Sequence, residues 1–341
     1  MILRELSDAI GVSGNEDDVR GLIVDAVRDH VDQLEIDAMG NVLALKRGSE
    51  EDPLRVMLAA HMDEIGLMVI GHDDDGLLKV RSVGGIDGRL LPGTLFAVGP
   101  DRLPGVIGVK PIHLLESGEA EKAPKIEDLV VDIGAKDKDE AQKLAPLGTY
   151  ATFATRFREL EEVVSGKAFD DRAGCAVLVE LLRGEPFAFD LHAAFTVQEE
   201  VGLRGARVAA FAIDPDCAFA LEGTIADEIP KEKDVSPTTE MGKGPAITVM
   251  DRSFIADRRL VRLLVDTAEE QGIPYQIKQP GMGGTDAGAI HLAREGVPSA
   301  TVAVPSRYIH SPVALMSLDD FDNTVRLMRE SLSRLTRDLL E

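Results

Sequence analysis

Three stretches of this sequence are mostly apolar and have the length of a single strand. They read LRVMLAA, LHAAFTV and DCAFAL, at residues 54–60, 191–197 and 216–221. Such runs are typical of strands buried on both faces, as in sheets that carry helices on either side. Amphipathic stretches at residues 252–272 and 318–340 supply candidate helices. The sequence therefore predicts an α/β fold in which helices flank a central mixed sheet.

The pattern of apolar runs in the sequence changes near Gly71 and changes back near Val163. Between them, short strand-like runs such as GLLKVRSV and DLVVDIGA are separated by Gly and Pro, and only KDKDEAQKLA is weakly helical in character. Closely spaced short strands favour a small barrel or sandwich. We therefore predict an inserted all-β, barrel-like domain at residues 71–162. It would interrupt a catalytic domain made of residues 1–70 and 163–341.

Charge and composition exclude several classes of protein. The formal net charge of −23 argues against nucleic acid or an anionic membrane as a partner, because both would be repelled. No stretch approaches the ~18 uncharged apolar residues of a membrane span, and the first residues do not have the pattern of a signal peptide. The two cysteines, Cys175 and Cys217, are far apart and suit a reducing compartment. We expect a soluble, cytoplasmic protein.

Histidines and acids come directly after the predicted strands, where catalytic groups gather in open α/β sheets. These candidates are His61, Asp63, Asp170, Asp171, Glu199, Glu200, Glu222 and His310. Two imidazoles and several carboxylates form a ligand set that suits Zn²⁺, Co²⁺ or Mn²⁺. A pair of such ions, ~3.5–4 Å apart, needs one shared ligand, and a carboxylate serves well. A further carboxylate that binds no metal could take a proton from the water between the ions.

The tandem acids Glu199 and Glu200 can supply both of these carboxylate roles, because neighbouring residues point in different directions where a strand ends. Asp63 lies two residues after His61 and could accept its second N–H, which would fix the tautomer. Structural alternatives stay open at this point. His61 could be a buried core histidine, and Asp170 could cap a helix.

Two further motifs have a structural interpretation. The stretch GMGGTDAGAI lacks the Lys-Ser/Thr ending of a phosphate-binding loop, so it predicts a glycine-rich turn before a helix, capped by Thr285 or Asp286. Ser13 and Glu16 have the spacing of a capping box at the start of another helix.

Glu222 also has a structural alternative, since it could be a surface acid. The apolar run before it nevertheless predicts the end of a strand.

The motifs SGNEDDVR, AAHMDEIGLMV, KAFDDRAGCAVL, FTVQEEVGLRGA and GGTDAGAIHLAREGVPSATVAVPSRYIHSPV resemble, in this order, those of the tetrahedral aminopeptidases. The resemblance extends from about Ser13 to Val313. This family comprises dinuclear metallopeptidases that include glutamyl and deblocking aminopeptidases. The resemblance implies an α/β peptidase domain interrupted by a β-barrel-like domain that serves assembly.

The resemblance also implies which residues hold the two divalent ions, expected to be Zn²⁺ or Co²⁺, with Mn²⁺ as a further candidate. His61 and Glu222 would hold one ion. Glu200 and His310 would hold the other, and Asp170 would bridge the two.

Other roles follow from the same resemblance. Glu199 would be the general base, and Asp63 would orient the first histidine ligand. The peptide bond of Asp170–Asp171 would be cis. The best-known members have Asp where this chain has Glu222, so Asp227 is the alternative ligand if Glu222 points elsewhere.

The expected function is that of a metal-dependent aminopeptidase. It would hydrolyse amino-terminal residues from short peptides, through a hydroxide held by two metal ions and with Glu199 as the general base. The resemblance implies a homo-oligomer, a dodecamer built from dimers. A related dinuclear metallo-carboxypeptidase or amidohydrolase, and a non-catalytic oligomeric shell, are the alternatives. A glycosidase that used paired carboxylates would leave both histidines without a role.

Overall fold

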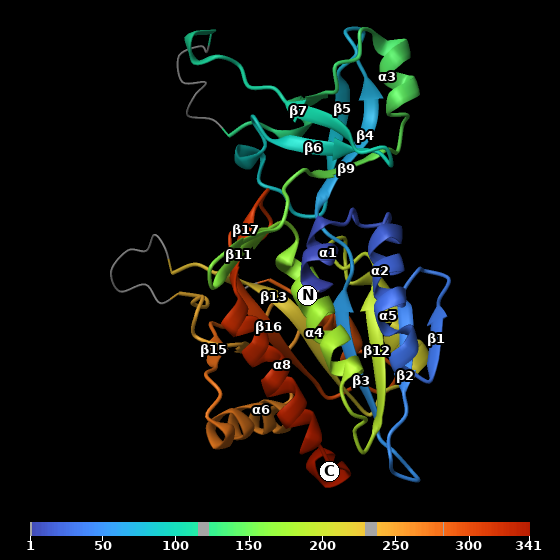
Figure 1. Ribbon diagram of the computed structural model, residues 1–341, viewed down its shortest axis with the longest axis vertical. Helices are drawn as coiled ribbons and strands as arrows, with labels where there is room; N and C mark the ends of the chain where they lie inside the picture. The colour runs from blue at the N-terminus through green and yellow to red at the C-terminus, as the bar shows by residue number, and fades with distance from the viewer. Residues whose placement is uncertain (1, 115–122, 229–236, 282) are drawn as a thin grey trace.

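The computed structural model describes residues 2–114, 123–228, 237–281 and 283–341 (Figure 1). These residues form a large mixed sheet flanked by helices and a separate closed barrel of six strands. Figure 1 shows the barrel at one end of the long axis, with the sheet and its helices below it. The predicted fold, an α/β unit with an inserted all-β barrel, is confirmed.

The large sheet has 11 strands and a parallel centre. Strands β12, β3, β13 and β16 are parallel neighbours, whereas β2 and β17 border them in the antiparallel sense. In spatial order the strands are β1 (Gln33–Ile36), β2 (Val42–Lys46), β12 (Asp190–Thr196), β3 (Arg55–His61), β13 (Cys217–Ala226), β16 (Ser299–Arg307), β17 (Ala314–Ser317), β11 (Val163–Gly166) and β10 (Arg158–Leu160), with β14 (Ala246–Thr248) and β15 (Gln276–Lys278) branching from β16.

Helices cover both faces of this sheet, which explains why its central strands are so apolar. The helices that share one core are α1 (Ile2–Asp8), α2 (Asp17–Val27), α4 (Phe169–Arg183), α6 (Arg258–Gln271) and α8 (Leu318–Ser333). The short helix α9 (Arg337–Leu340) ends the chain. A second core, rich in alanine, packs α5 (Arg204–Ile213) and α7 (Ala287–Ile290) against β12, β3 and β13. Within the four described segments, no helix is long and apolar enough to cross a membrane.

The barrel closes in the order β4-β5-β8-β7-β6-β9 around its own apolar core. Its strands are β4 (Gly66–His72), β5 (Leu78–Val83), β6 (Leu95–Val98), β7 (Leu103–Ile107), β8 (Val130–Asp132) and β9 (Tyr150–Phe153), and helix α3 (Lys138–Leu144) packs beside β4. Strand β4 begins before residue 71, and β10 pairs with β11 of the large sheet. We therefore propose that the inserted domain covers about residues 66–153 and not 71–162.

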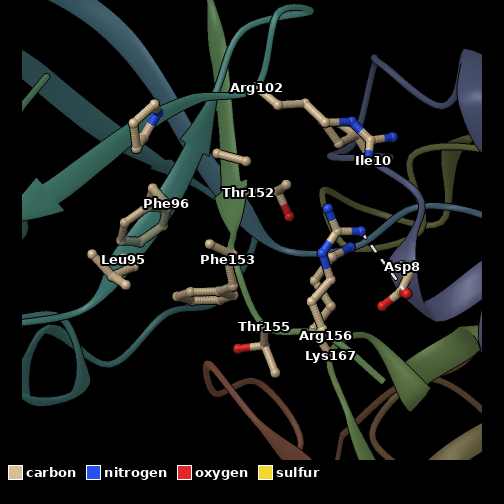
Figure 2. A pocket seen from close by; sticks show the side chains of 13 residues that line it. Asp8, Ile10, Leu95, Phe96, Arg102, Thr152, Phe153, Thr155, Arg156 and Lys167 are labelled. Atoms are coloured by element: carbon tan, nitrogen blue, oxygen red, sulfur yellow. Dashed lines mark ion pairs between the residues drawn. The ribbon is translucent and has the colours of Figure 1, made fainter. Parts of the chain in front are cut away.

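A cavity of about 170 Å³ lies where the barrel meets the large domain (Figure 2). Phe96 and Phe153 form an apolar wall, and Arg156 lies 3.9 Å from Asp8 across the opening. Lys167 also lines this cavity, but its ammonium points to buried acceptors on the other side. None of the histidines or acids predicted to bind metal lines it.

Candidate metal centre

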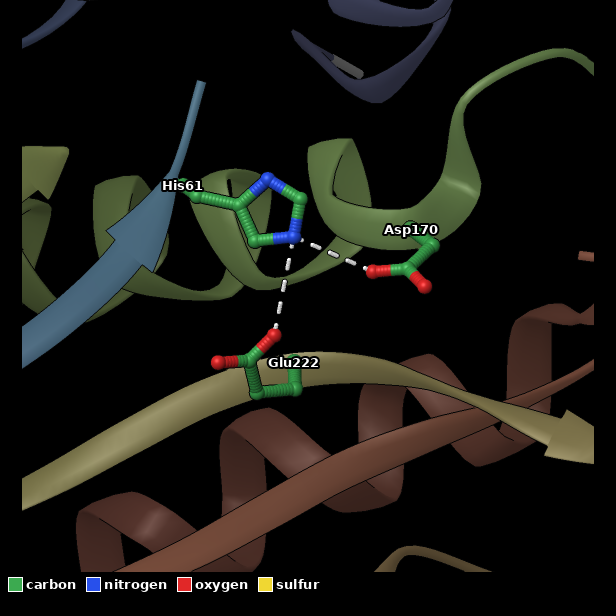
Figure 3. Close-up of side chains that lie close together, drawn as sticks. All are labelled: His61, Asp170 and Glu222. Carbon is green, nitrogen blue, oxygen red and sulfur yellow. Dashed lines mark hydrogen bonds and ion pairs between the residues drawn. The ribbon is translucent and has the colours of Figure 1, made fainter. Parts of the chain in front are cut away.

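Three side chains from separate elements meet at the carboxyl end of β3. His61 ends β3, Asp170 lies at the start of α4, and Glu222 lies on β13 (Figure 3). The Nε2 atom of His61 is 3.2 Å from Asp170 Oδ1 and 3.7 Å from Glu222 Oε2. One ligand atom from each of the three lies within 4.8 Å of the others, so they can share a metal ion.

The sequence predicts that Glu222 lies at the end of a strand, but β13 continues beyond it to Ala226. It is nevertheless level with His61, since β13 and β3 run parallel and Ala220 pairs with Ala59 two residues earlier. The alternative ligand Asp227 accepts hydrogen bonds from the backbone N–H and the hydroxyl of Thr238 and belongs to neither group of candidate ligands.

A second group consists of Asp170, Glu200 and His310. The Nε2 atom of His310 is 3.5 Å from Asp170 Oδ2 and 3.5 Å from Glu200 Oε1. Asp170 therefore presents one carboxylate oxygen to each histidine, the arrangement of a ligand shared between two ions. The peptide bond between Asp170 and Asp171 is cis, as the resemblance implies.

Asp171, in contrast, faces away from both groups of ligands. Its Oδ2 accepts the backbone N–H of His61 at 3.0 Å, and its Oδ1 accepts that of Gly174 at 2.9 Å. Asp171 and not Asp170 thus satisfies a backbone donor in the first helical turn of α4. The alternative interpretation of Asp170 as a simple helix cap is not supported, because no side-chain hydrogen bond caps α4.

Both groups of ligands line a second cavity, which has a volume of about 510 Å³. Glu199 lies beside the first group and lines this cavity too. Its Oε2 is 3.9 Å from Nε2 of His61. Burial raises the pKa of the Glu199 carboxyl well above its usual value, and the charges of Glu222 and Asp286 raise it further, while His61 lowers it. A carboxyl with a raised pKa is suited to proton transfer near neutral pH.

Asp63 contacts His61 and the backbone of both Glu199 and Glu200. Its Oδ1 accepts the backbone N–H of Glu199 at 2.9 Å, and its Oδ2 accepts that of Glu200 at 3.1 Å. His61 Nδ1 is 3.1 Å from the carbonyl oxygen of Asp63 and 3.5 Å from its carboxylate. The Ser13 hydroxyl donates to Oδ2 at 2.6 Å. Asp63 thus contacts both the histidine and the turn that carries the two glutamates.

His310 is oriented by the barrel domain. Its Nδ1 lies 3.0 Å from the carbonyl oxygen of Gly85, in the segment that follows β5. An acceptor at Nδ1 favours the tautomer whose Nε2 is free to bind a metal. His310 itself has a left-handed backbone conformation, with a φ of 56°. The inserted domain therefore contributes to the geometry of the second group.

The charges of the site are unbalanced without cations. Burial raises the pKa of Glu200 to about 7 and that of Asp286 to about 6, and it raises the pKa of Glu222 well above its usual value. Burial also opposes the charge of His310, but Asp170 and Glu200 raise its pKa to about 10. Clustered buried carboxylates of this kind are stabilised by divalent cations. The donor set therefore fits metal ions.

The sequence predicts helix caps at several residues that instead hold the site together. The side chains of Thr285 and Asp286 do not cap α7. Asp286 is fully buried, accepts a hydrogen bond from the Thr196 hydroxyl, and donates its backbone N–H to Glu222 Oε1 at 3.1 Å. The capping box is also wrong, because Ser13 binds Asp63 and no side chain caps α2. In both motifs a polar residue stands just before a helix. The sequence alone does not distinguish a helix cap from a residue that binds a side chain of the site.

The chain is similar over its whole length to known proteins. Residues 40–327 match the sequence profile of the family described as M42 glutamyl aminopeptidase. The chain is 38% identical to the lysyl aminopeptidase of Pyrococcus furiosus, over 98% of this chain and 96% of that protein. The structure is similar to that of aminopeptidase APDkam598 from Desulfurococcus kamchatkensis, with a TM-score of 0.95, 38% identity and coverage of 100% and 96% of the two chains.

The structure is also similar to that of the Pyrococcus horikoshii TET1 peptidase, which can assemble into a tetrahedron or a large octahedral shell. That match has a TM-score of 0.86 and 37% identity, and it covers 97% of this chain and 98% of the other. A profile that spans most of the chain and relatives that share its full length lead to one conclusion. The chain belongs to the M42 family of aminopeptidases.

Proposed function

We propose that this protein is a metal-dependent aminopeptidase that removes amino-terminal residues from short peptides. The observation that carries the proposal is Asp170, whose two carboxylate oxygens face His61 and His310, with Glu199 beside them in one cavity. Membership in a family of aminopeptidases supports the reaction class.

The ligands of the two ions would be those that the geometry groups together. His61, Asp170 and Glu222 would hold one ion, and Asp170, Glu200 and His310 would hold the other. Two divalent cations would supply Lewis acidity toward the scissile carbonyl and lower the pKa of a water molecule.

The protein's own residues supply the proton transfer. Glu199 takes a proton from the attacking water and delivers it to the leaving amine, a role that its place beside His61 in the cavity supports. Asp63 holds the backbone of Glu199 and Glu200, so the base and the ligand next to it keep a fixed separation. The excess of carboxylates would attract the free α-amino group of a peptide, and this would direct cleavage to the chain end.

The test is the variant Glu199→Gln in protein loaded with Zn²⁺ or Co²⁺. We expect bound metal and fold to be retained while kcat falls by about 100-fold or more, the usual contribution of a general base. Substrates would be a peptide with a free amino terminus and its acetylated form. Full activity of Glu199→Gln would disprove the role of the base. Cleavage of the acetylated peptide at an equal rate would favour an amidohydrolase or a carboxypeptidase.

We further propose that the chain forms a homo-oligomer, a dodecamer built from dimers. The support is the related P. horikoshii peptidase, which can assemble into a tetrahedron. A closed shell would admit short peptides and exclude folded proteins. Sedimentation of the purified protein measures this directly, and a monomer or an isolated dimer would contradict the proposal.

A further inference from the structure

A lysine lies among the acids of the site cavity. Lys278, at the end of β15, lines the same cavity as His61, Asp170 and Glu199, and it is 6% exposed. Among the described residues, no carboxylate oxygen lies within 4.0 Å of its ammonium, the limit for an ion pair. Its ammonium also donates no hydrogen bond to any of these residues. An ammonium that lines a cavity without a protein partner is a natural partner for a charged ligand.

The acids whose charges act on Lys278 have other partners. Asp251 influences Lys278 through its charge, but both oxygens of Asp251 are already used. Its Oδ1 accepts from Ser253 and from the backbone N–H of Phe254, and its Oδ2 accepts from the Thr285 hydroxyl. The charges of Glu222 and Asp170 also reach Lys278, yet both face the histidines as candidate metal ligands.

A second polar group on the cavity wall is also without a partner. Thr224 follows Glu222 by two residues on β13, lines the cavity and is 2% exposed. Its hydroxyl makes no hydrogen bond with the parts of the chain that the structure describes. The cavity thus combines a wall of carboxylates, which attracts a positive amine, with an ammonium and a hydroxyl that can both donate to an anion.

An amino-terminal aspartate or glutamate matches this distribution of charge. It carries a positive α-amino group and a negative side chain within one residue. We propose that Lys278 determines substrate specificity by pairing with the side-chain carboxylate of an acidic first residue. This inference rests on the proposed function. The family name alone does not give it, because a relative with 38% identity is described as a lysyl aminopeptidase.

The test compares aminoacyl 7-amido-4-methylcoumarins of Glu, Leu and Lys, which lack a carboxy-terminal carboxylate. We expect the wild type to prefer Glu, and Lys278→Met to lower kcat/KM for Glu on the order of 100-fold while leaving Leu little changed, as for loss of one buried charge partner. Lys278→Glu should favour Lys. Lys79→Met, on an exposed barrel position, is the matched control.

Each outcome separates the inference from the function it rests on. Cleavage of Leu but no preference for Glu by the wild type, or an equal loss on all three substrates in Lys278→Met, would overturn the inference alone. No cleavage of any substrate by the metal-loaded wild type would refute both. If Lys278→Met instead removes a preference for Leu-Gly over its carboxy-terminal amide, the carboxylate is that of the peptide end and the side-chain assignment is wrong.

The same variant has a readout that does not depend on activity. Replacing an unpaired buried ammonium by an apolar side chain of similar shape should raise the melting temperature of the ligand-free protein. Lys278→Gln, which keeps a polar group, serves as a second variant for the substrate panel if Lys278→Met does not fold. A lower melting temperature in Lys278→Met would show that the charge already has a partner, and would contradict the inference.

Discussion

Glu64→Gln should destabilise the protein strongly, because Glu64 is the anion between two buried cations. Its oxygens lie 2.6 and 2.8 Å from the ammonium of Lys167, and Oε1 is 3.2 Å from Arg172 Nη2. All three side chains are at most 3% exposed. The amide of Gln has nearly the same shape, so the substitution removes the charge and little packing.

The loss of stability follows from the two cations that are left without their shared anion. Glu64→Gln leaves Lys167 and Arg172 buried without the carboxylate that lies between them. Removing one partner of a buried ion pair costs about 3–5 kcal/mol, so we expect a loss of about 4 kcal/mol.

Thermal unfolding measures this loss. An unfolding entropy of about 2.1 cal/mol/K per residue over 341 residues gives about 0.7 kcal/mol/K, so 4 kcal/mol lowers the melting temperature by about 6 °C. The matched control is Glu159→Gln, whose partner Arg4 is 2.7 Å away at the surface. Exposed pairs contribute less than about 1 kcal/mol, so the control should shift by little more than 1 °C. Equal shifts in the two variants would show that the buried charge of Glu64 is no more important for stability than an exposed one.

Two further predictions concern the same region. Burial lowers the pKa of Lys167 from 10.5 to about 8, so between these values the unfolded chain binds a proton that the folded protein does not, and stability rises with pH. The free energy of unfolding of the wild type relative to Lys167→Met should therefore increase by about 3 kcal/mol from pH 8 to 10.5 in denaturant titrations, and a flat difference would contradict this. Ser13→Ala removes the hydroxyl that donates to Asp63 and should reduce stability by about 1.5–3 kcal/mol in the same titrations, whereas an unchanged value would show that Asp63 does not need that donor.

The fold was largely predictable because its signals are local. The run before His61 is buried along nearly its whole length in β3, and such a run identifies a central parallel strand without knowledge of its neighbours. The Gly and Pro spacing of the inserted segment likewise indicates short strands. The boundary near residue 71 was harder to place, since Gly66–His72 reads equally well as a strand of either sheet.

The site was predictable only in part. Residues after apolar runs, such as His61 and Glu200, could be found because strand ends gather at one edge of a sheet. Lys278 could not, because β15 has only three residues and its side chain reaches the cavity through tertiary packing. The contact between Gly85 and His310 joins residues 225 positions apart, in two domains. Such pairings depend on how the domains pack and leave no periodic pattern in the sequence.

In our proposal, Asp170 joins two metal sites, one completed by His61 and the other by His310. The direct measurement is the number of Zn²⁺ ions per subunit after dialysis against a buffered excess, determined by plasma mass spectrometry. We expect two ions in the wild type and in the exposed-histidine control His30→Ala, and one each in His61→Ala and His310→Ala. We expect none in Asp170→Ala. A wild type that binds a single ion, or an Asp170→Ala variant that keeps two, would contradict the proposal.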